Sequence, residues 1–232
     1  MLISRIGKWF GVELIEVSIT EKLVAAFGGG LSILALIGLS VWALPETGAT
    51  AIIGSMGASA VLLFAVPHGQ LSQPWPVIAG HAISAIIGVS CARFIPQPIL
   101  AAACASGLAI GAMHQLKCIH PPGGATALTA VIGGSAIHEL GYRFVLFPVL
   151  SNAIVMVLMA VLINSAFKWR RYPAILNRPA PSPTRGPGTE APPPTHEEVL
   201  DAVKSLDSFV DISEEDLLRL VELLKRHPGQ PR

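Results

Sequence analysis

The sequence predicts an all-α membrane protein with four long transmembrane helices, two short Gly/Ala-rich membrane helices and a small helical cytoplasmic tail. Hydrophobic residues make up 52% of its 232 residues and charged residues only 13%, about half the charged share of a soluble domain. Ten of the 16 basic and ten of the 15 acidic residues lie in 168–232. Four apolar runs approach or exceed the ~20 residues that a spanning helix needs. The chain therefore joins a nearly uncharged membrane body to a charged tail.

Four regions follow from this division. Residues 1–21 repeat apolar side chains every three or four positions, which predicts an amphipathic helix in the membrane interface. The transmembrane domain is expected at 22–168. A Pro-rich linker at 169–195 predicts extended chain. Two short amphipathic helices are expected at 196–232, and they are too small to build a core alone. We expect this tail to pack on a partner, another subunit or the membrane domain.

Within the membrane body, the expected helices differ in length and composition. The four long apolar segments are 23–44, 77–94, 99–116 and 144–167, and the two shorter ones, rich in Gly, Ala, Ser and Thr, are 49–66 and 123–137. Basic residues cluster at both ends of the body, which places both termini in the cytoplasm. The number of crossings is then even: six if the short segments cross, four if both are re-entrant. We expect a multi-pass protein of a bacterial inner membrane.

The two short segments contain related motifs. Residues 57–60 read Gly-Ala-Ser-Ala and residues 124–127 read Gly-Ala-Thr-Ala. Each motif follows one long apolar segment and precedes another. A duplicated unit of long, short and long helix explains this order, and three crossings per unit would invert the second copy, as in many transporters. Coincidence among small residues is the alternative.

The start of the second short segment predicts an anion site. His120 precedes two prolines, which cannot lie inside a helix, so a helix is expected to begin near Gly123 with unpaired N–H groups. Such helix starts bind small anions, and the first copy is expected to do the same. The candidate substrate-binding residues are Gly54, Ser55, Gly57, Ala58, Ser59, His81, His120, Gly123, Gly124, Ala125 and Thr126. Close helix packing is the alternative for the glycines, and hydrogen-bonded packing for the histidines.

Other site classes have little support in the sequence. No histidine pair has HxxxH or HxxE spacing, and no acidic residue lies inside a long apolar segment, so we expect no metal and no cofactor. A net charge of +1 gives no reason to expect nucleic acid.

Several of these residues together resemble the HPP family, which is named for its His-Pro-Pro motif. The resemblance rests on residues 54–64, the loop 67–74, the Gly-His pair at 80–81 and residues 120–128, and it covers roughly 20–170. The family motif falls on His120, Pro121 and Pro122. The resemblance implies an integral membrane protein, usually described with four spanning helices, and plant chloroplast and cyanobacterial members are associated with nitrite transport.

We therefore expect a transporter or channel for a small monovalent anion, with nitrite as the best candidate, that passes between the N-termini of the two short helices. We expect the protein to act as a homo-oligomer in the lipid bilayer and not as an enzyme. One alternative is a non-transporting sensor or assembly protein that acts through its tail. A less favoured alternative is an intramembrane enzyme that uses a histidine.

Overall fold

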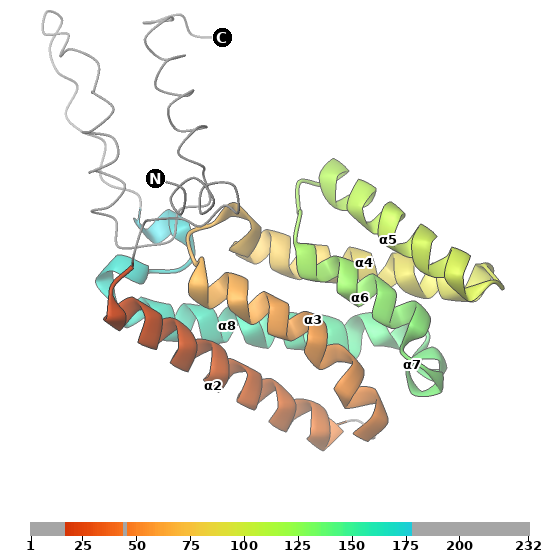
Figure 1. Ribbon diagram of the computed structural model, residues 1–232, viewed down its shortest axis with the longest axis horizontal. Helices are drawn as coiled ribbons and strands as arrows, with labels where there is room; N and C mark the ends of the chain where they lie inside the picture. The colour runs from red at the N-terminus through yellow and green to blue at the C-terminus, as the bar shows by residue number, and fades with distance from the viewer. Residues whose placement is uncertain (1–16, 44–45, 178–232) are drawn as a thin grey trace, which may run out of the picture. The chain divides into compact units, whose positions relative to one another are not determined.

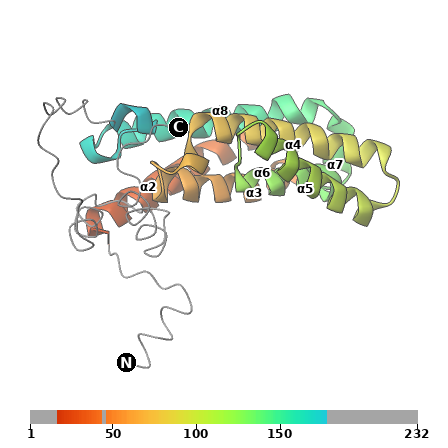
Figure 2. The same cartoon turned by 90° about the horizontal axis from the view of Figure 1, so that it is seen from above.

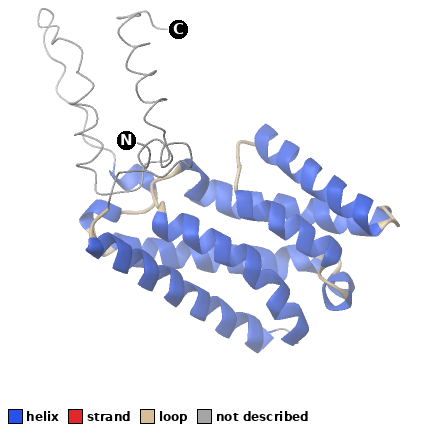
Figure 3. Cartoon of the chain, in the orientation of Figure 1, coloured by secondary structure: helices blue, strands red, loops and turns tan. Residues whose placement is uncertain are grey.

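A computed structural model describes residues 17–43 and 46–177, and every regular element in them is helical (Figures 1 and 3). The predicted interfacial helix lies outside the described residues except for its last five, and the linker beyond residue 177 and the tail 196–232 lie wholly outside them. The α-helices are α2 (Ile19–Ala43), α3 (Glu46–Ala65), α4 (Pro74–Phe94), α5 (Pro98–Gln115), α6 (Pro121–Ile132), α7 (Ser135–Leu140) and α8 (Ser151–Ser165).

The four long predicted helices are confirmed as α2, α4, α5 and the pair formed by η2 and α8. Segments Ile19–Leu39, Pro74–Phe94, Pro98–Gln115 and Val145–Ser165 are each long and apolar enough to cross a membrane. Prolines at the first helical positions of α4 and α5 fix where these helices begin, because proline suits the first turn and lacks only an N–H that would be unpaired there. The last span opens with a π-helical segment, η2 (Val145–Leu150), which contains Pro148.

The two shorter Gly/Ala-rich helices are confirmed as α3 and α6, but their bounds differ from those predicted. Helix α3 begins at Glu46, upstream of the expected segment 49–66, and runs for 20 residues. No proline lies between Glu46 and Gly54, so nothing stops the helix from beginning upstream of Gly54. The second segment, 123–137, is divided. Helix α6 ends at Ile132, and Gly134, with φ of 86°, turns the chain into α7.

Six helices, α2, α3, α4, α5, α6 and α8, run in alternating directions between two ends of the domain (Figures 1 and 2). The start of α4 meets the end of α5, where Trp75 Nε1 donates to Leu116 O. Helix α6 then runs parallel to α4, since Gly80 packs on Gly123 and Gly88 packs on Ala127. The ends of α3 and α8 meet, where Asn164 Nδ2 donates to Leu63 O. Helices α3 and α6 therefore each run from one end of the domain toward the other, and neither forms a re-entrant turn.

This arrangement fits the expected duplication of three helices. The first unit is α2, α3 and α4, and the second is α5, α6 and the η2–α8 span. The middle helices α3 and α6 pack on one another, α4 packs on α6, and α8 packs on α3 in the same way. The two copies of the motif consequently lie on antiparallel helices that face each other.

The outer surface is suited to lipid. Large apolar side chains are exposed along most of the helices, and they include Phe27 and Leu34 of α2, Leu108 of α5 and Leu162 of α8. A soluble monomer rarely exposes so much contiguous apolar surface. The main buried cluster lies between α3, α4, η2 and α8 and includes Leu63, Val77, Phe144 and Met156. The chain is an integral, multi-pass membrane protein.

Candidate functional site

Two buried imidazoles meet at the centre of the helical domain. His81 lies on α4, and His120 is the residue immediately before α6. Both side chains are fully buried, and their ring centroids lie 4.9 Å apart at an interplanar angle of 67°. Gly80 allows this approach, because a Cβ at that position would lie 2.8 Å from His120 Cβ. The glycine beside His81 is therefore required for close packing.

A serine hydroxyl from α3 bridges the two rings. Ser59 Oγ lies 2.8 Å from His81 Nε2 and 2.9 Å from His120 Nε2. Ser59 is fully buried, and its hydroxyl also lies 3.2 Å from Ser55 O, one turn back on the same helix. Three separate segments thus contribute one polar side chain each to one buried contact.

Thr126 of α6 completes the group. Thr126 Oγ1 lies 2.7 Å from His81 Nδ1 and 3.3 Å from Pro122 O, one turn back. Thr126 and Ser59 hold the same position in the two copies of the repeated motif. The repeat therefore places equivalent hydroxyls on the two nitrogens of one imidazole. We call Ser59, His81, His120 and Thr126 the buried polar cluster.

The far end of the cluster is a backbone carbonyl. His120 Nδ1 lies 2.8 Å from Leu71 O, in the loop between α3 and α4. Sequence reasoning missed this contact because a carbonyl carries no residue-specific signal. The loop is itself fixed by side chains, since Ser72 Oγ donates to Leu62 O and Gln73 Nε2 donates to Pro67 O and Gly69 O.

The remaining predicted site residues lie at or outside the edge of this cluster. Gly123 is buried against α4, where a Cβ would lie 2.8 Å from Ser84 Oγ, so this glycine allows two helices to approach closely. Ser55 contacts the cluster through its backbone carbonyl oxygen, which lies 3.2 Å from Ser59 Oγ. Gly54, Ala58 and Ala125 are exposed, and Gly57 and Gly124 are half-buried with open space where a Cβ would be.

The expectation that two helix starts meet at the site is wrong. Gly54 lies eight residues inside α3, so the N–H groups around it are in a continuous helix and not at an open end. Because α3 and α6 are antiparallel, their N-termini lie toward opposite ends of the domain. Only α6 begins near the cluster, and its Gly123 N–H already donates to His120 O. The polar groups offered here are side-chain hydroxyls and imidazoles.

A second buried polar group lies at the C-terminal end of α3. Arg170 is 1% exposed, and its guanidinium donates to Phe64 O and to Asn164 Oδ1. Burial lowers the pKa of Arg170 to about 10, so this side chain is charged at neutral pH and stabilises the negative end of α3. In the sequence, Arg170 is one of several basic residues at the membrane edge, and nothing in that pattern distinguishes it from Lys168 or Arg171.

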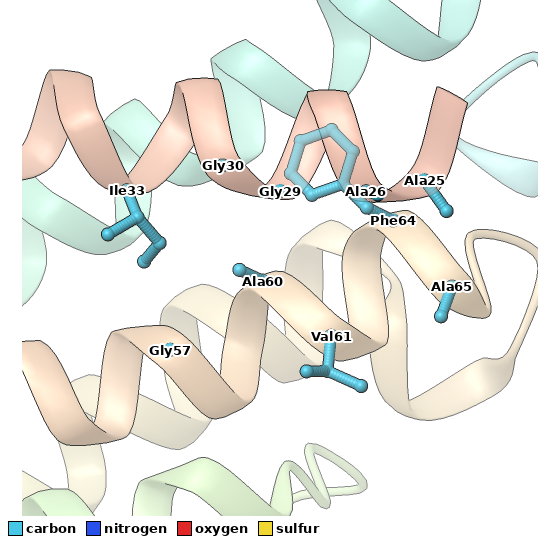
Figure 4. A pocket seen from close by; sticks show the side chains of 10 residues that line it. All are labelled: Ala25, Ala26, Gly29, Gly30, Ile33, Gly57, Ala60, Val61, Phe64 and Ala65. Atoms are coloured by element: carbon cyan, nitrogen blue, oxygen red, sulfur yellow. The ribbon is translucent and has the colours of Figure 1, made fainter. Parts of the chain in front are cut away.

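The larger pockets are separate from the polar cluster. A groove of about 470 Å³ between α2 and α3 is lined by small and apolar residues such as Gly29, Gly57 and Phe64 (Figure 4). A pocket of about 320 Å³ near the C-terminal end of α4 is lined by Arg93, Ala130, His138 and others. Among residues 17–43 and 46–177, no three His, Cys, Asp or Glu side chains are placed to hold a metal ion.

Comparison with known proteins gives one family and two curated relatives. A family model described as the transmembrane region of HPP proteins matches residues 15–173. Two Dictyostelium discoideum proteins, each described as a transmembrane protein, are 38% identical over 148 residues and 40% identical over 126 residues. These matches cover 62% and 53% of this chain and 47% and 44% of the relatives, so the chain spans about half their length. No solved structure matches the chain.

Proposed function

The chain belongs to the HPP transmembrane family, and from this we propose that it transports a small monovalent anion, with nitrite as the best candidate. The observation that carries the proposal is the buried polar cluster. Four side chains that can donate hydrogen bonds are at most 1% exposed inside an apolar domain. Burying polar groups costs free energy that apolar packing would not, and ionisable residues inside a membrane are typically functional.

The chemistry of the cluster favours an anion over a cation. Imidazole N–H and hydroxyl groups donate hydrogen bonds to anions, whereas α4, α6 and α8 contain no Asp or Glu to attract a cation. Nitrite is small, planar and singly charged, so a few donors suffice for it. Hydroxyls and imidazoles distinguish it poorly from nitrate, formate or chloride.

The proposed path runs between α3 and α6, past Ser59 and Thr126, in place of a path between two helix starts. The cluster is closed, so an anion passes only if these helices separate. Alternating movement of two inverted repeats around a central site achieves this in other transporters. The pocket beside Arg93 offers a cationic approach on one side, because positive charge in a cleft concentrates anions.

The test is flux through purified full-length protein in liposomes. Separate gradients of nitrite, nitrate, formate and chloride are imposed, and anion uptake is measured against protein-free vesicles. We expect uptake of nitrite above the protein-free rate. If no anion moves faster than in protein-free vesicles, the transporter proposal fails.

One contact favours a second candidate, an intramembrane enzyme. Ser59 Oγ lies 2.9 Å from His120 Nε2, and His120 Nδ1 is fixed by Leu71 O, which resembles the serine, base and orienting group of acyl transfer. A fluorophosphonate probe tests it directly. Labelling of the wild type that is lost in Ser59→Ala supports the enzyme, and absence of labelling contradicts it.

The proposal also covers the membrane in which the protein lies and its state of assembly. We place the protein in a bacterial inner membrane as a homo-oligomer. The domain end that carries Lys117, Lys168 and Arg171 is proposed to face the cytoplasm, because basic residues favour that side. The other end carries Arg93 and Arg143.

A further inference from the structure

We propose that the protein moves one proton together with each anion, and that the buried polar cluster takes up that proton. This inference rests on the transport function proposed above and assigns its coupling ion. It follows from the direction of the hydrogen bonds in the cluster, from the alternative acceptor beside each hydroxyl, and from the charges around the cluster.

The direction of the hydrogen bonds is fixed from one end. Leu71 O only accepts, so His120 Nδ1 must carry the proton in their 2.8 Å contact. In a neutral ring the other nitrogen, Nε2, is then an acceptor. Ser59 lies 2.9 Å from it and must donate its single proton there.

The directions of the remaining two hydrogen bonds follow from the first two. Ser59 has no second proton, so in the 2.8 Å contact with His81 it accepts from His81 Nε2–H. His81 Nδ1 is then the acceptor, and Thr126 Oγ1, 2.7 Å away, donates to it. All four hydrogen bonds therefore run in one direction, from Thr126 through His81 and Ser59 to His120 and Leu71 O, with one proton in each link.

Each hydroxyl also has a second acceptor one helical turn back. Thr126 Oγ1 lies 3.3 Å from Pro122 O, and Ser59 Oγ lies 3.2 Å from Ser55 O. In the neutral cluster both hydroxyls donate to imidazole nitrogens, since otherwise a buried acceptor would remain unsatisfied. When a proton adds to His81 Nδ1, the Thr126 O–H turns to Pro122 O, and its oxygen accepts from the new N–H. Ser59 does the same for His120 Nε2 with Ser55 O.

The cluster is therefore built to accept a proton at either ring without loss of a hydrogen bond. One N–H bond forms as one O–H bond of a hydronium ion breaks, water is released, and the cluster gains one positive charge. A second proton is opposed by repulsion between imidazolium rings whose centroids are 4.9 Å apart. The expected stoichiometry is one proton for each anion.

The surrounding charges make this proton necessary. Several titratable or charged side chains lie on the described elements that pack around the cluster and on the segments that join these elements. In the first half they are Glu46 on α3, His68 in the α3–α4 loop, Cys91 and Arg93 on α4, Cys104 and His114 on α5, and Lys117 and Cys118 before α6. In the second half they are His138 and Glu139 on α7, Tyr142 and Arg143 before η2, Lys168 and Arg170 on η3, and Arg171 and Tyr172 after η3. Helices α6 and α8 carry none.

The nearest fixed charges on the helices lie far from the cluster or already form hydrogen bonds elsewhere. Glu46 precedes Ser59 by 13 residues and Arg93 follows His81 by 12 residues, roughly 20 Å and 18 Å along a helix. Arg170 is bound to Phe64 O and Asn164 Oδ1, where it offsets the negative end of α3. Lys117 precedes His120 by three residues, but its side chain is exposed. Among the described residues, an anion in the cluster thus meets no buried fixed positive charge that lacks other hydrogen-bond partners, and a buried unpaired charge is strongly unfavourable. A protonated imidazole supplies the missing charge.

The experiment measures nitrite and proton uptake together in proteoliposomes that contain a trapped pH dye. Potassium and valinomycin set the membrane potential, and protein-free vesicles measure the leak of nitrous acid. We expect one proton for each nitrite and a rate that does not change with membrane potential. The double variant His81→Gln/His120→Gln retains hydrogen-bonding groups in place of both rings but cannot take up a proton, so we expect uptake at least tenfold lower. His114→Gln makes the same chemical change at an exposed histidine on α5 outside the cluster, so it should keep coupled uptake.

The outcomes separate the two proposals. Nitrite uptake that follows membrane potential without proton uptake overturns the coupling and leaves the transporter intact. Fully coupled uptake by a monodisperse His81→Gln/His120→Gln protein also overturns it. Absence of flux for any anion overturns both. If this double variant does not fold, His81→Asn/His120→Asn is measured in its place with the same expectation, because asparagine also hydrogen-bonds without taking up a proton.

Discussion

Ser59 and Thr126 occupy the same position in two repeated motifs, yet they act on one histidine. Their hydroxyls contact opposite nitrogens of His81, and Ser59 alone reaches His120 as well. A histidine bonded through both nitrogens is held in one orientation and one tautomer. Ser59 is therefore the residue on which the geometry of both rings depends.

Removal of the Ser59 hydroxyl is predicted to destabilise the protein. In Ser59→Ala, both His81 Nε2 and His120 Nε2 lose a buried partner, and each unsatisfied group costs about 1–3 kcal/mol. Thermal unfolding in detergent measures the loss. Ser90→Ala is the matched control, because Ser90 lies on α4 away from the cluster and its hydroxyl contacts Ile86 O and Tyr142. Equal stability of the two variants would contradict the structural role of Ser59.

Tyr172 provides a pH-dependent prediction outside the spanning helices. Its hydroxyl donates to Ser72 O at 2.7 Å, and burial raises the pKa of Tyr172 above its ordinary value. A raised folded-state pKa gives stability that is fully present below the unfolded value of about 10 and is lost as the pH rises through the folded value. The wild type should lose more stability than Tyr172→Phe between pH 8 and about pH 11. Equal loss in both proteins, measured by thermal unfolding, would show that Tyr172 does not contribute, and exposed Tyr142→Phe is the control.

At the scale of helices, the sequence predicted that each helix exists better than it predicted the residues at which each helix begins and ends. The long apolar runs correctly predicted α2, α4, α5 and the η2–α8 span, and the His-Pro-Pro run predicted a helix start near Gly123, because both signals are local. The start of α3 was missed, since Gly54 resembles Gly123 in composition but lacks the His-Pro-Pro stop before it. The division at Gly133 and Gly134 was also missed, because the residues on both sides of it are apolar.

The contact between α4 and α6 depends on glycine. A Cβ at Gly88 would lie 2.5 Å from Ala127 O and 2.7 Å from Ala130 Cβ, so Gly88→Ala is predicted to force the helices apart at a cost of about 1–3 kcal/mol. Gly107 on α5 has nothing within 4 Å of its Cβ position. Gly107→Ala should be neutral or stabilising by about 0.5–1 kcal/mol, because alanine favours helix over glycine. Denaturation midpoints that fall equally for both variants would contradict the close approach.

At the scale of the whole molecule, four of the eleven predicted substrate-binding residues form one cluster. Ser59, His81, His120 and Thr126 were each identified from residue type and motif. Their hydrogen-bonded order was not predictable, because it depends on which helix faces cross and on the Leu71 carbonyl. The buried Arg170 was missed for the same reason, since tertiary contacts alone separate it from its exposed basic neighbours.

The alternating helices predict six crossings. Lys117, before α6, and Arg143, after α7, then lie on opposite membrane faces, and Arg171 lies on the same face as Lys117. In a background in which Cys91, Cys104 and Cys118 are replaced by alanine, single Lys117→Cys, Arg143→Cys and Arg171→Cys variants are treated with an impermeant maleimide in vesicles of known orientation. Reaction of Lys117→Cys and Arg143→Cys from the same side would indicate a re-entrant α6 and four crossings.

The most direct test of the central claim, that the buried polar cluster is the transport site, is nitrite uptake by proteoliposomes containing Ser59→Ala/Thr126→Val. Ser90→Ala/Thr129→Val makes the same chemical changes on α4 and α6 outside the cluster and serves as the matched control. We expect at least a tenfold loss of uptake in the cluster variant and no loss in the control, with both proteins monodisperse. Uptake by the cluster variant at the wild-type rate would contradict the account.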